Sequence, residues 1–147
     1  MRGAIGFGVL AVTMGLGALG CGDDTGGGEP AACLTDLPRD CSIVWADYDA
    51  IWRNGMTTCG SADTGPFCHS AEGQMAGLNL SDQDTAYEAL LGGLDGRARV
   101  IPGDPECSVL MQRLESEDPA FQMPPSGRMT DAERCSIIKW IAEGANR

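Results

Sequence analysis

One stretch of the sequence, from Cys59 to His69, combines residue types that could hold a metal-bearing group. His69 is the only histidine in the 147-residue chain, and it directly follows Cys68. Eight residues separate Cys59 from Cys68. A single histidine excludes a multi-histidine metal site and a histidine relay. It can supply one strong ligand to a metal, while the two thiols anchor the group that carries the metal.

A second candidate ligand lies far along the chain. Met123 precedes two consecutive prolines, in a stretch from residue 115 to 129 that has no regular period. The prolines restrict the backbone and could hold the thioether at a fixed point. An early histidine and a rigidly placed methionine are a matching pair of axial ligands for haem iron. We therefore predict His69 and Met123 as the iron ligands, with Met129 as the alternative methionine.

Helical periodicity predicts the elements that position these residues. Apolar side chains recur at helical spacing in four segments of the chain. The first helix is expected from about Ser42 to Gly55 and leads into Cys59. A second opens at Ser81, a third at Asp104 with a proline in its first position, and the last at a capping box beginning at Thr130. The prediction is an all-α domain of about four helices around one core, with a long irregular loop before the last helix.

Short motifs in a fixed order carry a family resemblance. They are Cys68-His69-Ser70, Gly77-Leu78-Asn79-Leu80, Val100 to Pro105, Ser108-Val109-Leu110, Met123-Pro124-Pro125, Thr130 to Glu133 and Trp140 to Ala145. From about Tyr48 to Ala145 the sequence resembles a c-type cytochrome domain, particularly the short single-haem domains of exported bacterial proteins. The family normally has two residues between its cysteines, whereas this chain has eight.

The resemblance implies a small cytochrome c-like fold around a haem pocket. Cys59 and Cys68 would form thioether bonds to haem c, His69 would be the proximal ligand and Met123 the distal ligand. The function implied is single-electron transfer with a redox partner protein, so an electron carrier is expected more than a catalyst. Apolar walls would raise the reduction potential by disfavouring the charge of the ferric form; the expected wall residues are Trp52, Leu78, Leu110 and Ile141.

Two other interpretations of the same residues stay open. Cys59 and Cys68 could close a local disulfide in a haem-free, disulfide-stapled module that uses the same scaffold for binding or structure. A zinc site could use Cys59, Cys68, His69 and one more cysteine, although neither cysteine pair has the short spacing of a zinc ribbon. No nucleophile motif accompanies the single histidine, so hydrolase chemistry has no support.

The remaining cysteines are expected to be oxidised, because an exported chain with an even number of them favours disulfides. Cys107 and Cys135 fall on the core faces of two predicted helices, and we predict a disulfide between them. Cys33 with Cys41 is the remaining pairing, on weaker grounds.

The first twenty residues have the pattern of an export signal. They begin with one positive charge and continue with small and apolar residues up to Cys21. The residues before Cys21 resemble a bacterial lipoprotein signal, which implies a lipid anchor on that cysteine; an ordinary secretory signal with a spare thiol is the alternative. We predict a signal peptide at 1–20, a flexible tether at 21–32 and a cytochrome c-like domain at 33–147, anchored to the cell envelope on its periplasmic or outer face.

The charge of the chain limits its partners. The formal net charge is −11, which disfavours nucleic acid and anionic lipid as binding partners. Arg97 and Arg99 stand close together in a predicted turn, where they could contact an anionic ligand group or neutralise neighbouring carboxylates.

Overall fold

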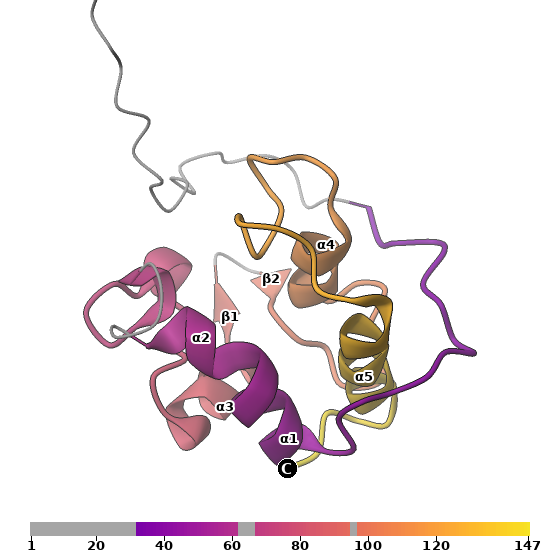
Figure 1. The fold of residues 1–147 in the computed structure, drawn as a ribbon, viewed down its shortest axis with the longest axis horizontal. Helices are drawn as coiled ribbons and strands as arrows, with labels where there is room; N and C mark the ends of the chain where they lie inside the picture. The colour runs from indigo at the N-terminus through magenta and orange to yellow at the C-terminus, as the bar shows by residue number, and fades with distance from the viewer. Residues whose placement is uncertain (1–31, 62–66, 95–96) are drawn as a thin grey trace, which may run out of the picture.

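A computed structural model describes residues 32–61, 67–94 and 97–147 (Figure 1). Within these ranges the protein is helical, with four helical segments and one very short β-ribbon. This confirms the predicted all-α class. The predicted signal peptide, Cys21 and all but the last residue of the predicted tether lie outside the described residues. Among the described residues, no helix has the length and apolar character needed to cross a membrane.

The first helical segment joins three elements without a break. It comprises α1 (Tyr48–Ile51), the π-helix η1 (Trp52–Met56) and α2 (Thr57–Gly60). The Asp47 side chain caps α1 by accepting a 2.8 Å hydrogen bond from the Ala50 amide. The predicted start at Ser42 was wrong, because the amides of Val44 and Trp45 donate to the Ser136 hydroxyl, at 2.9 and 3.1 Å, in an extended segment.

The middle of the chain contains shorter elements. The 3₁₀-helices η2 (Phe67–His69) and η3 (Met75–Gly77) precede α3 (Gln83–Leu91), which Asp82 caps through the Thr85 amide. Strands β1 (Gly93–Leu94) and β2 (Arg97–Ala98) then pair antiparallel.

Two elements frame the long loop of the domain. Helix α4 (Val109–Glu115) begins four residues later than predicted, because Asp104 instead lies in a turn in which its side chain accepts a hydrogen bond from the Cys107 amide. Residues 116–130 form the long irregular loop that was predicted. Helix α5 (Asp131–Ala142) follows, and its capping box of Thr130 and Glu133 is confirmed.

The hydrophobic core joins the first and last helical segments. Helix α1 packs against α5, and the ring of Tyr48 stacks on Trp140 with 5.3 Å between centroids. Tyr48 also meets Tyr87 of α3 edge-to-face at 5.0 Å. Such aromatic contacts add to the stability from apolar burial. Other core residues are Ile51, Leu90, Val100, Met111, Ile137 and Ile141, each at most 2 % exposed.

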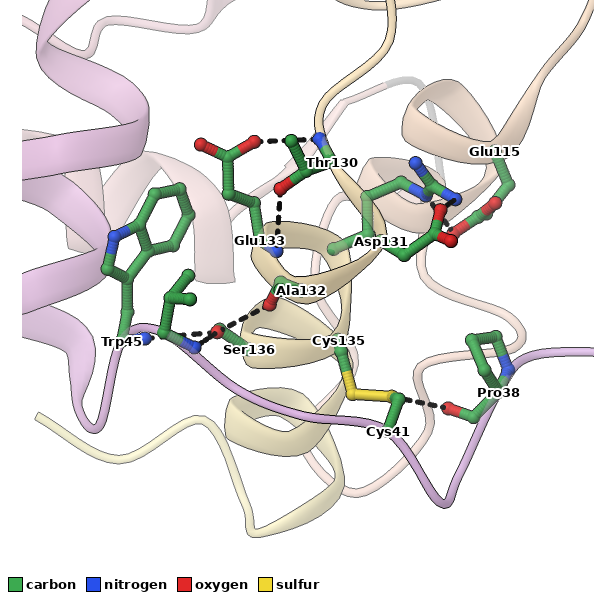
Figure 2. Close-up of a disulfide and its surroundings, with 12 residues drawn as sticks. Pro38, Cys41, Trp45, Glu115, Thr130, Asp131, Ala132, Glu133, Cys135 and Ser136 are labelled. Carbon is green, nitrogen blue, oxygen red and sulfur yellow. Dashed lines mark hydrogen bonds and ion pairs between the residues drawn. A yellow bond between two sulfur atoms is a disulfide. The ribbon is translucent and has the colours of Figure 1, made fainter.

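Two disulfides fasten the N-terminal described segment to the turn before α4 and to α5. Cys33 is bonded to Cys107, and Cys41 is bonded to Cys135. The predicted bond between Cys107 and Cys135, and that between Cys33 and Cys41, were therefore wrong. Cys135 lies in α5 as expected, whereas Cys107 lies in the turn before α4 and not on a helix face. An extended segment that runs along the outer side of α5 supplies both partners (Figure 1; Figure 2).

Candidate cytochrome-like site

The structure brings Cys59, Cys68 and His69 onto two neighbouring elements. Cys59 lies in α2, Cys68 and His69 lie in η2, and these elements pack against each other. Cys59 is partly buried against the hydrophobic core, and Cys68 is 8 % exposed. The connecting residues 62–66 lie outside the described residues. The predicted grouping of two cysteines and one histidine is thus present at the level of elements.

The two cysteines differ in chemical state. Cys59 is a free thiol, and burial raises its pKa, so it stays protonated at neutral pH. Cys68 is disulfide-bonded. The local disulfide between Cys59 and Cys68, expected for the haem-free alternative, was therefore wrong.

A close backbone approach fixes η2 beside α2. The Leu80 amide donates a 2.8 Å hydrogen bond to the carbonyl of His69. On the other side of Leu80, a Cβ atom added at Gly60 would lie 2.2 Å from the Leu80 carbonyl oxygen. Only glycine permits this approach. Gly60 therefore positions His69 through Leu80. Sequence reasoning missed this role, because the only sign of it in the sequence is a glycine directly after Cys59.

Met123 lies in the loop between α4 and α5. Its amide donates a 2.9 Å hydrogen bond to the Arg113 carbonyl, and its side chain is partly buried. A cis peptide bond joins it to Pro124. The role of the Met123 sulfur as an iron ligand stays a prediction.

Met129, the alternative ligand, lies in a different environment. It packs against the hydrophobic core, and its terminal methyl group is 3.6 Å from the Cβ position of Gly55. The ring of Trp45 covers the same glycine. Met129 thus fills space between the first helical segment and the N-terminal extended segment.

A shallow hollow flanks the cysteine and histidine elements. Its volume is about 420 Å³, and its lining comes from the residues beside the two elements: Trp52, Thr57, Gly60, Ser61, Ser70, Ala71, Glu72 and Ser81. The indole nitrogen of Trp52 is buried without a hydrogen-bond partner among the described residues. Neither His69 nor Met123 lines this hollow, so it is not the predicted haem pocket.

The four expected wall residues belong to the protein's own packing. Ile141 is fully buried in the hydrophobic core. The other three are partly exposed and pack against that core: Trp52, Leu78 and Leu110. These three retain apolar surface that a bound group could cover.

Arg99 was expected to contact an anionic ligand group or to neutralise neighbouring carboxylates, but it binds backbone carbonyls. Its guanidinium donates to the carbonyls of Ala76, at 2.7 Å, and Ala89, at 2.8 Å, and so joins η3 to the end of α3. Burial lowers its pKa. Carbonyls at a helix C-terminus favour a cation. The side chain of Arg97 lies outside the described side chains.

The zinc alternative loses a ligand in this arrangement. A disulfide sulfur is not a thiolate, so Cys68 could bind zinc only after reduction. Across residues 32–61, 67–94 and 97–147, no group of three or more histidine, cysteine, aspartate or glutamate side chains is placed to hold a metal ion.

Comparison with known proteins gives one family match. The model of a family described as Planctomycete cytochrome C matches residues 67–127. No curated protein matches the chain. No solved structure matches it either. The matched range starts after Cys59 but contains Cys68, His69 and Met123. The match, together with the helical fold, supports a cytochrome c-like domain.

Proposed function

We propose that this chain is an exported haem-binding protein that transfers single electrons. The observation that carries the proposal is the family match over residues 67–127, because that range contains both proposed iron ligands, His69 and Met123. When bound, haem supplies an iron that cycles between its ferrous and ferric forms.

The donor chemistry of the chain fits this group. The His69 nitrogen and the Met123 sulfur would be two ligands that haem iron accepts, and the methionine would raise the reduction potential. The backbone hydrogen bonds of His69 and Met123 would hold these two residues before haem arrives. The partly exposed apolar side chains of Trp52, Leu78 and Leu110 would then be covered by the group.

Attachment through the cysteines has one requirement. A thioether forms when a thiol adds its sulfur and its proton across a vinyl group, a step that needs no oxidant. Cys59 is already a thiol, whereas the disulfide of Cys68 must first be reduced. We infer that a dithiol reductant first reduces the Cys68 disulfide to two thiols and is itself oxidised to a disulfide, and that haem c is attached at both cysteines afterwards.

The cellular setting is also proposed. A lipid on Cys21 would anchor the domain to the cell envelope, with a protein as redox partner. The net charge of −11 supports a partner with a basic docking surface.

An absorption spectrum of the exported protein tests the proposal. We expect an intense Soret band when the chain is purified from an export-competent host that also expresses haem-attachment proteins. His69→Ala should lose that band or shift it, because the proximal ligand is gone. Colourless wild-type protein would instead favour the haem-free, disulfide-stapled module, which the two disulfides at Cys107 and Cys135 also fit.

A further inference from the structure

The irregular loop of residues 116–130 is closed by a partly buried cluster of charges. Glu115, the last residue of α4, accepts hydrogen bonds from Arg134 at 2.8 Å and from Arg128 at 2.7 Å. Its side chain is only 15 % exposed, and that of Arg134 is 10 % exposed. Arg134 lies in α5 and also donates to Asp131 and to the Met129 carbonyl. The cluster therefore joins α4, the loop and α5.

The position of Glu115 shows that its carboxylate needs these partners. A negative charge at a helix C-terminus is unfavourable, because the helix dipole is negative there. Glu115 occupies that end of α4, and two guanidinium groups offset the cost. Removing a partner from a buried ion pair leaves the other charge uncompensated. The cluster is consequently sensitive to loss of the Glu115 charge alone.

A second set of contacts joins the same helix to the middle of the loop. The guanidinium carbon of Arg113 lies 3.8 Å from the ring centroid of Phe121, and its nitrogen donates to the Phe121 carbonyl at 3.3 Å. The Met123 amide donates to the Arg113 carbonyl. Helix α4 thus holds the loop at two places: at Met123 through Arg113, and at Arg128 through Glu115.

We propose that Glu115, with Arg134 and Arg128, positions the loop that carries Met123. That this loop presents an iron ligand rests on the proposed function. That Glu115 holds the loop closed does not depend on it. Glu115 touches no proposed haem ligand, so it acts through the loop backbone. Opening of the cluster would release the end of the loop from α4 and α5.

Hydrogen exchange of the purified full chain tests the positioning role. In Glu115→Gln, amides of residues 116–130, including that of Met123, should exchange on the order of tenfold faster than in the unmodified protein, since a charged hydrogen-bond partner is lost. The Ala86 amide in α3, which donates to Asp82, should keep its rate. Asp49→Asn is the matched control, because it removes one carboxylate from an exposed pair with Arg53.

Each outcome decides the proposal. Unchanged loop exchange, or an equal acceleration in α3, would overturn it. If Glu115→Gln does not fold, Arg128→Gln gives the same test, because that side chain is 37 % exposed. In haem-loaded protein the far-red absorption from methionine-to-iron ligation should disappear at a lower temperature in Glu115→Gln than in Asp49→Asn. Identical temperatures would contradict the ligand-positioning role, whereas colourless wild-type protein would contradict only the proposed function.

Discussion

At the scale of single residues, each proposed iron ligand is fixed by a backbone hydrogen bond. The carbonyl of His69 accepts from Leu80, and the amide of Met123 donates to Arg113. In the proposed function, the imidazole and thioether groups would be the parts that contact the cofactor. Backbone anchoring also separates Met123 from Met129, whose side chain packs against the core.

Replacement of Met123 and replacement of Met129 should therefore have different effects on the absorption spectrum. We expect Met123→Leu to abolish the far-red absorption of the ferric protein, because leucine keeps the volume and removes the sulfur ligand. Met129→Leu should retain the band. Absorption spectra of both variants, with circular dichroism to confirm folding, make the comparison. A band that survives in Met123→Leu and disappears in Met129→Leu would assign the ligand to Met129.

Tyr48 gives the fold a sensitivity to alkaline pH. Burial raises the pKa of Tyr48 above its ordinary value of 10.0, and its hydroxyl donates to the Gln83 carbonyl at 2.9 Å. The unfolded chain loses this proton more readily, so the stabilisation is complete below pH 10 and declines as the pH rises further. Urea unfolding at several pH values should show this decline, and Tyr48→Phe should reduce its slope. An equal slope in both proteins would contradict the assignment.

At the scale of elements, the approach of Leu80 to Gly60 determines how η2 sits beside α2. We expect Gly60→Ala to lower the free energy of unfolding by about 3 kcal/mol, because its new methyl group would overlap a backbone carbonyl. Gly55→Ala is the comparison, since its methyl would meet side chains and no backbone atom: the Trp45 ring at 2.8 Å and the Met129 methyl at 3.6 Å. Its loss should be about 1 kcal/mol or less, since alanine also favours the helix. Equal losses from the two changes would contradict the role of Gly60.

Local sequence signals predicted some elements well and others poorly. The capping box at Thr130 and the prolines of the Met123 loop act through nearby residues, and both expectations agree with the structure. The segment before Tyr48 has helical spacing, yet Ser136, 91 positions beyond Trp45, binds its amides. Long-range partners of this kind have no local pattern, which is also why the cysteine pairing could not be derived from the sequence.

The disulfide connectivity can be checked directly. Peptide mapping of the non-reduced protein should link Cys33 to Cys107 and Cys41 to Cys135. Replacing both Cys41 and Cys135 with serine should cost about 4 kcal/mol of unfolding free energy, because this bond closes a loop spanning 94 sequence positions. A peptide linking Cys107 to Cys135 would contradict the connectivity, and unchanged stability would contradict the energetic role.

At the scale of the whole molecule, the fold was more predictable than the site. Helical periodicity gave the all-α class and the four helical segments, because burial of apolar stripes depends on repeating patterns. The site depends on the oxidation state of particular thiols, and the free Cys59 beside a disulfide-bonded Cys68 has no signal in the spacing. The cytochrome proposal therefore depends on chemistry at Cys68 as much as on the fold.

The most direct test of the central claim measures haem on the denatured chain. The protein is purified from an export host with haem-attachment proteins, denatured, and analysed by intact mass together with mapping of Cys59 and Cys68. We predict one haem per chain, with both cysteines as thioethers. A chain without haem, in which Cys59 is still a thiol and Cys68 is still disulfide-bonded, would contradict the electron-transfer account.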